Sequence, residues 1–354
     1  MGALSVSVAM ATFNGGAHLA EQLADLAEQS MLPAELVVCD DGSSDETLAT
    51  LEAFAISAPF PVHIHRNPKR LSYRANFLKC AGLCGSDLIA FCDQDDRWDP
   101  KKIATMVRCF DDPEVLLAFH DAEIVDEEER PLGRLMRARP VGRSAPLSGS
   151  PWAFSLGFTQ VFRRWLCDCD SWWAQSADPN SADEPMAHDQ WYFFLASALG
   201  TIVNIEAPLV RYRQHGANVF GWAKAKRTLG ARLLAKIASA TWLYQRRLHS
   251  AEQSAIILEQ ASSILPKPYD RHAREGALAY RQLADMCAKR AGIHAGRTIF
   301  DRARSFAALA SAGGYGSDPR RFGARALVMD VVVGLSGITR KKKSRTAPVD
   351  TPTP

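Results

Sequence analysis

Three carboxylates lie within four residues, directly after the apolar run Leu88–Cys92, and they belong to Asp93, Asp95 and Asp96. Carboxylates packed this closely repel one another unless a cation neutralises them. Hard oxygen ligands at this density suit Mg²⁺ or Mn²⁺, which keep several water ligands and often bridge to the phosphates of a substrate. A solvated acidic turn would explain the same residues, so this cluster alone leaves both interpretations open.

A second acidic run, DDGSSD at residues 40–45, follows another short apolar run. Ser43 and Glu46 have the spacing of a capping box, which predicts that a helix begins there. Asp40 and Asp41 are not needed for that cap. Their carboxylates are therefore candidates to accept hydrogen bonds from a nucleobase or a ribose hydroxyl.

Both acidic runs fall at the ends of expected strands, and this predicts the architecture that positions them. Four apolar runs have the length of buried strands: residues 5–12, 35–39, 62–64 and 87–92. Helical patterns alternate with them at residues 17–29, 43–55 and 74–83. This alternation predicts an α/β fold, with a mostly parallel, Rossmann-like sheet and flanking helices. Ligands of such sheets bind beyond the carboxyl ends of the strands, where the acidic runs lie.

The net charge of +3 conceals two parts of opposite charge. Residues 1–222 hold 18 Lys and Arg against 30 Asp and Glu, whereas residues 223–354 hold 24 against 9. We therefore expect an acidic α/β domain over 1–222 and a basic helical region over 223–339. A basic, Pro-rich tail over 340–354 is expected to be disordered.

The basic region predicts either a solvated face or contact with an anionic membrane. Its apolar stretch 326–338 is too short to span a bilayer and has Arg and Lys on both sides, which suits an interfacial segment. Nucleic acid is not an expected partner, since no recognised binding motif is present. The N-terminus lacks the basic segment of a signal peptide. We expect a cytoplasmic protein with reduced thiols, peripheral to the inner face of the cell membrane.

Five motifs, in order over residues 5–222, resemble those of family 2 glycosyltransferases of the GT-A fold. They are MATFNG (10–15), DDGSSDET (40–47), FCDQDDRWDP (91–100), HDQW (188–191) and PLVRYRQHGAN (208–218). The last two are similar to the rhamnosyltransferase-like branch, which builds bacterial cell-surface polysaccharides. The resemblance implies an inverting transferase that moves a sugar from a nucleotide-sugar to a glycan or lipid-linked acceptor. The branch suggests dTDP-rhamnose as the donor.

The resemblance also implies roles for single residues in holding the nucleotide. Thr12 and Phe13 are expected at the base, with Asp41, and less directly Asp40, at the base edge. Asp93 is expected near the ribose.

The remaining implied roles concern the metal and the chemistry. Asp95 is expected on a divalent Mg or Mn ion that bridges the diphosphate, and His215 is expected nearby as a metal ligand or counter-charge. Asp189 matches the catalytic base, which takes the proton of the acceptor hydroxyl. As a residue that precedes an apolar helix, Asp189 is equally explained as an N-cap.

Two other functions fit parts of the same pattern. A sugar-phosphate nucleotidyltransferase shares the sheet architecture, but the loop after the first expected strand lacks the basic residues of that class. A membrane-associated, non-catalytic scaffold with a degenerate transferase domain is the other alternative. The intact acidic motifs count against it, and hydrolysis of a nucleotide-sugar would separate the two.

Overall fold

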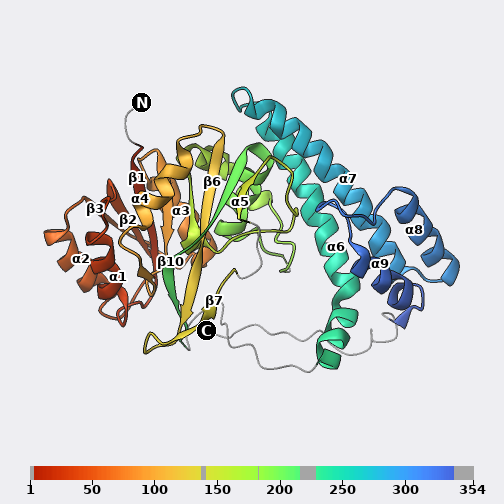
Figure 1. Cartoon of the computed structure of the whole chain (residues 1–354), viewed down its shortest axis with the longest axis horizontal. Helices are drawn as coiled ribbons and strands as arrows, with labels where there is room; N and C mark the ends of the chain where they lie inside the picture. The colour runs from red at the N-terminus through yellow and green to blue at the C-terminus, as the bar shows by residue number, and fades with distance from the viewer. Residues whose placement is uncertain (1–3, 137–140, 182, 216–228, 339–354) are drawn as a thin grey trace. The chain divides into compact units, whose positions relative to one another are not determined.

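The computed structural model describes residues 4–136, 141–181, 183–215 and 229–338 of the chain (Figure 1). The described residues within Met1–Gln175, Pro185–Ala223 and Ala261–Ala273 form one compact unit. Those within Ser176–Glu184, Lys224–Gln260 and Arg274–Pro354 form a second. The expected domain boundary near 222 and the tail 340–354 lie outside the described residues.

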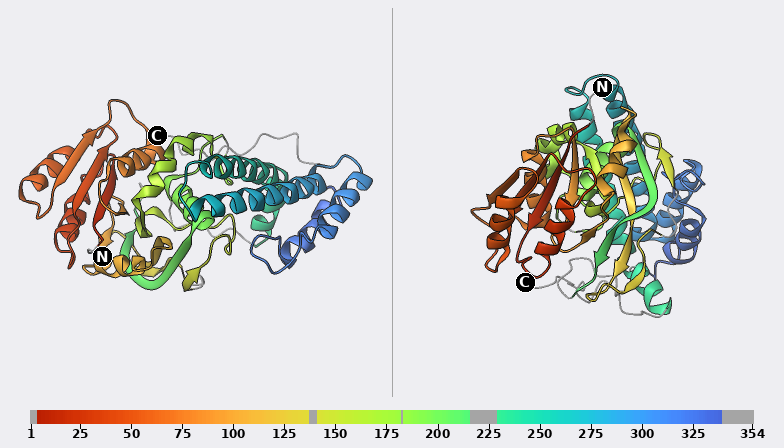
Figure 2. Two further views of the ribbon diagram at one scale, coloured as in Figure 1. Left: turned by 90° about the horizontal axis from the view of Figure 1, so that it is seen from above. Right: turned by 60° about the vertical axis from the view of Figure 1, so that its left-hand side comes forward.

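A ten-stranded sheet forms the first unit, with strand order β3-β2-β1-β4-β9-β6-β10-β5. Two further strands lie off this path, since β7 pairs with β6 and β8 pairs with β10. The strands are β1 (Val6–Thr12), β2 (Glu35–Asp40), β3 (Val62–Arg66), β4 (Leu88–Cys92), β5 (Arg97–Trp98), β6 (Val115–Val125), β7 (Pro131–Arg134), β8 (Gly142–Ser144), β9 (Gln160–Arg163) and β10 (Thr201–Arg213). Figure 2 shows this sheet from two further sides.

The sheet is mixed, and in this respect it differs from the mostly parallel sheet that the sequence predicts. Strands β3, β2, β1 and β4 are mutually parallel, as are β6 and β10. The short strand β9 inserts between the two groups and runs antiparallel to both β4 and β6. The strands β5, β7 and β8 also pair antiparallel with their neighbours.

Helices cover both faces of the sheet in the first unit. They are α1 (Leu19–Ala27), α2 (Thr47–Ser57), α3 (Ser72–Leu83), α4 (Lys102–Val107) and α5 (His188–Leu199), with shorter turns η1 (Arg108–Phe110), η2 (Gly157–Thr159) and η3 (Arg164–Gln175). Alternate residues of β1, such as Val8 and Met10, pack with Leu23 of α1 and Met106 of α4 in one core. On the other face, α3 packs against β1 and β2 and also contacts α5.

The second unit is helical. Its described elements belong to α6 (Leu229–Ala261), α7 (Tyr269–Ala295), α8 (Ile299–Ser311), α9 (Ala324–Met329) and the π-helical turn η4 (Asp330–Gly334). The prediction of an α/β fold followed by a helical C-terminal region is therefore confirmed. Among the described helices, none combines the length and the apolar character needed to cross a bilayer.

Candidate active site

The carboxyl ends of β1, β2 and β4 lie side by side, because the strands are parallel and in register. Thr12 at the end of β1 is opposite Asp40 at the end of β2, and Met10 is opposite Cys92 at the end of β4. The two acidic runs that follow β2 and β4 therefore begin at the same edge of the sheet, as the sequence predicts.

Asp40 organises the turn that follows β2. Its fully buried carboxylate accepts hydrogen bonds from the Thr12 hydroxyl (3.0 Å), the Ser43 amide (2.9 Å) and the Gly42 amide (3.1 Å). The Ser43 hydroxyl donates to the same carboxylate. Gly42 has a φ of 91°, a left-handed conformation that glycine adopts without strain. The described hydrogen bonds of Asp40 thus stabilise the turn after β2. A contact between Asp40 and a nucleotide stays a prediction.

The expected capping box of Ser43 and Glu46 is wrong. Helix α2 begins at Thr47, and its N-cap Glu46 makes no side-chain cap hydrogen bond. The Ser43 hydroxyl instead accepts the Asn14 amide at 2.9 Å, while the Asp45 carboxylate accepts the Thr47 amide at 3.1 Å. The loop after β1 competes for Ser43, so a tertiary contact replaces the local one.

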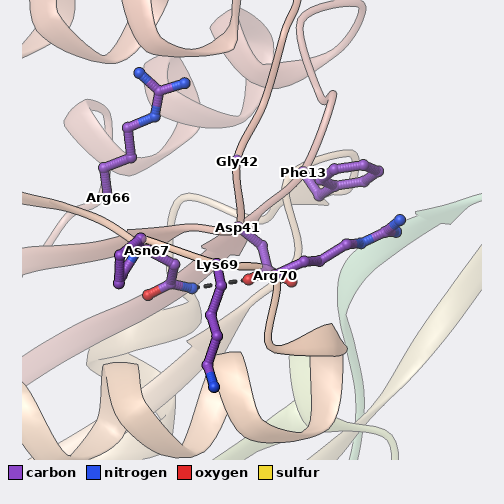
Figure 3. Close-up of a pocket in the computed structure, with 8 residues that line it drawn as sticks. Phe13, Asp41, Gly42, Arg66, Asn67, Lys69 and Arg70 are labelled. Carbon is purple, nitrogen blue, oxygen red and sulfur yellow. Dashed lines mark hydrogen bonds between the residues drawn. The ribbon is translucent and has the colours of Figure 1, made fainter.

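Asp41 borders a pocket of about 560 Å³ (Figure 3). Its carboxylate is already bonded, since it accepts the Asn67 side-chain amide (2.9 Å) and the backbone amides of Leu71 (2.7 Å) and Ser72 (2.9 Å). The pocket is lined by Phe13, Asp41, Gly42, Arg66, Asn67, Pro68, Lys69 and Arg70. It therefore combines an aromatic ring, a carboxylate, an amide and three cationic side chains.

Phe13 is fixed in this pocket from two sides. The Gln94 side chain accepts from the Phe13 amide (2.9 Å) and donates to the Phe13 carbonyl (3.2 Å). The Arg70 guanidinium lies 3.7 Å from the centre of the Phe13 ring, a cation–π contact (Figure 3). Our sequence reasoning missed Arg66, Lys69 and Arg70, although the end of β3 is the same kind of position as the ends of β2 and β4.

The three acidic side chains after β4 can share one cation. Oxygens of Asp93, Asp95 and Asp96 lie within 4.8 Å of one another. Asp96 is fully buried, and its Oδ2 has no hydrogen-bond partner among the described residues. Burial raises the pKa of Asp96 well above its ordinary value, and the charges of Asp95 and Asp93 add to this. A carboxylate set with an orphaned buried oxygen fits a hard divalent cation, such as Mg²⁺ or Mn²⁺.

His215 joins this cluster from the end of β10. Strand β10 pairs antiparallel with β5, which directly follows the acidic run, and this pairing brings the His215 Nε2 to 2.8 Å from the Asp95 Oδ2. The hydrogen bond to Asp95 raises the pKa of His215. The ring of His18 lies 5.3 Å away, and the Arg213 guanidinium is 2.6 Å from the His18 Nδ1. The structure thus brings Asp95 and His215 together, and their role as metal ligands stays a prediction.

A buried lysine lies beneath the acidic cluster. Lys102 is fully buried at the start of α4, where its Nζ donates to the Phe158 carbonyl (2.7 Å) and lies 3.3 Å from the centre of the Trp98 ring. Burial lowers the pKa of Lys102 to about 7, while the charges of Asp96 and Asp93 oppose this shift. Nothing in the local sequence identifies Lys102, because a lysine at a helix start is usually exposed.

Asp189 lies in the first turn of α5, close to the acidic cluster. The N-cap of this helix is Ala187, so Asp189 does not act as the cap. Its side chain is buried and accepts the Gln190 amide at 2.8 Å, while its backbone carbonyl accepts from Gln160 of β9 at 3.0 Å. The charge of Asp189 helps to raise the pKa of Asp93. The two carboxylates, 96 positions apart, therefore share one electrostatic environment.

Asp170 holds the start of α5 in place. Its carboxylate accepts the indole N–H of Trp191 (2.8 Å) and the hydroxyl of Tyr192 (2.7 Å), the second and third residues after Asp189. Both aromatic side chains are fully buried. Burial raises the pKa of Asp170 to about 7. Asp170 is thus a positioning residue for the helix that carries Asp189.

An Asp170→Leu variant is expected to lower the free energy of unfolding by about 2 kcal/mol or more, because each buried donor left without an acceptor costs about 1–3 kcal/mol. Urea denaturation measures this loss. The matched change Asp168→Leu, at an exposed position of the same turn, should shift the unfolding free energy by less than about 0.5 kcal/mol. Equal stability of the Asp170 variant and the unmodified protein would contradict the anchoring role.

Comparison with known proteins identifies relatives of this chain. The model of glycosyl transferase family 2 matches residues 7–177. An uncharacterized glycosyltransferase of Nostoc sp. is 23% identical over 227 residues, which cover 61% of this chain and 66% of the relative, just under two thirds of its length. The dTDP-rhamnosyl transferase RfbG of Shigella flexneri is 28% identical over 232 residues, covering 62% of this chain and 77% of RfbG.

One solved structure aligns with most of this chain. The crystal structure of S. aureus TarS (residues 1–349) in complex with UDP has 14% sequence identity and a TM-score of 0.49, and the alignment covers 87% of this chain and 90% of TarS. The family match and the sheet order described above agree with the predicted GT-A fold class.

Proposed function

We propose that the protein is a glycosyltransferase of family 2, whose model matches residues 7–177, and that it transfers a sugar from a nucleotide-sugar to an acceptor hydroxyl, with inversion. One observation carries the proposal. The acidic cluster, His215 and Asp189 come from three distant parts of the chain, yet they meet at one edge of the sheet beside the pocket of Phe13.

The acidic cluster and His215 would hold a divalent cation. The Asp95 carboxylate and the His215 Nε2 lie 2.8 Å apart, and the carboxylates of Asp93 and Asp96 supply further oxygen ligands. When bound, such a cation neutralises the charge that develops on a departing diphosphate. Asp93 would also orient the donor, by accepting a hydrogen bond from a ribose hydroxyl.

Asp189 would act as the base. As the acceptor oxygen attacks the anomeric carbon, the Asp189 carboxylate takes its proton, while the diphosphate leaves from the opposite face. Asp189 is buried, and its charge is close enough to Asp93 to help raise the pKa of Asp93, so the proposed base lies beside the acidic cluster.

The pocket beside Phe13 would receive the nucleotide base and part of the diphosphate. The Phe13 ring offers a stacking surface, and Arg66, Lys69 and Arg70 offer positive charge for phosphate oxygens. Thr12 and Asp40 support this pocket by holding the turn. The name of the Shigella relative supports dTDP-rhamnose as donor, and with it a role in cell-surface polysaccharide synthesis on a glycan or lipid-linked acceptor.

A donor screen tests the proposal. The purified protein is heated with dTDP-, UDP- or GDP-sugars, each with Mn²⁺ or Mg²⁺, and the midpoint of unfolding is recorded. We expect one nucleotide-sugar to raise the midpoint only when a cation is present. The same donor should then be consumed, with release of the nucleoside diphosphate. No stabilisation by any of these donors, together with no release, would contradict the proposal.

Cation binding is expected to depend on pH in a defined direction. Burial, and then the charges of Asp95 and Asp189, raise the pKa of Asp93 to about 8. A neighbouring cation favours the ionised form, so binding releases the proton. Release of the Asp93 proton should therefore make the apparent affinity for Mn²⁺ rise with pH, by up to about tenfold per unit as far as about pH 8. Titration calorimetry in buffers of different ionisation enthalpy measures both the affinity and the proton.

The matched variant for this experiment is Asp93→Asn, which cannot titrate. Its Mn²⁺ affinity is expected to change less with pH than that of the unmodified protein. A pH-independent affinity in the unmodified protein would show that Asp93 is already ionised and would contradict the expectation.

A further inference from the structure

The segment that begins with α9 has two faces of opposite character. Asp330, Val333 and Gly334 are buried against the rest of the second unit. On the other side, four aliphatic side chains are exposed, and we name them the valine face: Val328 (60% exposed), Val331 (44%), Val332 (61%) and Ile338 (52%). Exposed apolar side chains gathered on one short segment are typical of an interaction surface, whereas those scattered singly are not.

Asp330, the acidic residue of this segment, is buried and does not lie on the valine face. The fully buried Asp330 carboxylate accepts from the Arg290 guanidinium (2.9 Å) and the Tyr315 hydroxyl (2.7 Å), and it lies 2.8 Å from the His294 Nε2. The Arg290 guanidinium also lies 4.3 Å from the centre of the Tyr244 ring. Asp330 therefore fixes the segment to α7, and its charge is compensated inside the unit.

Positive charge flanks the valine face in the sequence. Between residues 318 and 345 there are eight Lys and Arg and two acids: Asp318, which pairs with Arg320 at 2.8 Å, and the buried Asp330. Arg325 is exposed one turn before Val328, and the sequence RKKKSR (340–345) follows soon after Ile338. An apolar face with this flanking charge complements a surface that is apolar inside and negative outside.

We propose that the valine face docks on an anionic lipid bilayer. The aliphatic side chains enter the boundary between headgroups and acyl chains, and the flanking cations pair with lipid phosphates. A second copy of the chain would be a less favourable partner for the valine face, because a symmetric interface would bring the same cations of both copies together and they would repel one another. The proposal does not depend on glycosyl transfer, and its test measures no activity.

Flotation of the full chain with lipid vesicles tests the proposal. Vesicles of equal parts phosphatidylglycerol and phosphatidylcholine should carry the protein, and vesicles of phosphatidylcholine alone should not. Raising the salt from about 0.1 M to about 1 M shortens the screening length from about 10 Å to about 3 Å and should weaken binding. We expect vesicle binding to weaken at least tenfold when Val331→Ser and Val332→Ser are combined. We expect the same loss of binding when the five Lys and Arg residues of 340–345 are replaced by Gln, because each basic residue near the membrane surface contributes to binding.

A matched control uses the exposed aliphatic residues of two other helices. Ile256→Ser and Leu278→Ser, combined, remove comparable apolar surface from α6 and α7 and should leave vesicle binding unchanged. Thermal unfolding shows that each variant is folded. Two outcomes overturn the proposal: equal binding by the Val331 and Val332 variant, or a dimer in light scattering that this variant dissociates while vesicle binding stays the same.

Discussion

An Asp189→Asn variant is expected to lose turnover by about 100- to 10,000-fold, the range that a general base contributes, while it still binds the donor. Asn keeps the shape of the side chain, and its carbonyl oxygen can still accept the Gln190 amide. It cannot take a proton from the acceptor. Release of nucleoside diphosphate from the donor measures turnover, and titration calorimetry with Mn²⁺ measures donor binding.

The control for this change is Asp168→Asn, at an exposed acid on η3 of the same unit. Its turnover should remain within about twofold of the unmodified protein. Turnover near the normal level in the Asp189 variant would show that Asp189 is not the catalytic base. A loss of donor binding together with turnover would instead assign Asp189 to the donor site.

An Asp95→Ala variant is expected to bind Mn²⁺ about 100-fold more weakly or worse, because the cation loses a charged ligand worth several kcal/mol. Donor binding that depends on the cation should fall with it. The fold should persist without metal, since the change also removes the repulsion among Asp93, Asp95 and Asp96. The unfolding midpoint, measured with and without Mn²⁺, reports both effects.

The matched change for Asp95 is Asp111→Ala, which removes an exposed acid after η1. This variant should keep the full stabilisation by Mn²⁺. The assignment of the cation to the acidic cluster fails if the Asp95 variant keeps that stabilisation too. Chelation with EDTA should reproduce the Asp95 result in the unmodified protein and leave the variant unaffected.

The pattern of apolar residues along the sequence was sufficient to predict the strands and helices in which that pattern is regular. The strands that end at Thr12, Asp40 and Cys92 could be predicted because each is an apolar run closed by polar residues. The helical character of the C-terminal region could be predicted from the helical spacing of its apolar residues. The capping box at Ser43 failed because the Ser43 hydroxyl instead accepts the Asn14 amide and donates to the Asp40 carboxylate.

Weak local signals left the short strands β5, β7, β8 and β9 unpredicted, whereas strands near 116–126 and 201–205 were expected and correspond to β6 and β10. Strand β9 has four residues, and its antiparallel place between β4 and β6 depends on contacts with both neighbours rather than on its own sequence. The pairing of β5 with β10 involves two residues of β5. Such short pairings are stabilised by the sheet that they join, so a linear pattern does not reveal them.

The sequence by itself determined which side chains could do the chemistry, because the spacing of Asp93, Asp95 and Asp96 is a local property. It also placed both acidic runs at strand ends. Only the tertiary structure decided that His215, 120 residues from Asp95, lies 2.8 Å from that carboxylate, and that Asp189 shares the electrostatic environment of Asp93. The physical reason is that strand order and register, not distance along the chain, set which strand ends are neighbours, and a sheet fixes both through hydrogen bonds between remote segments.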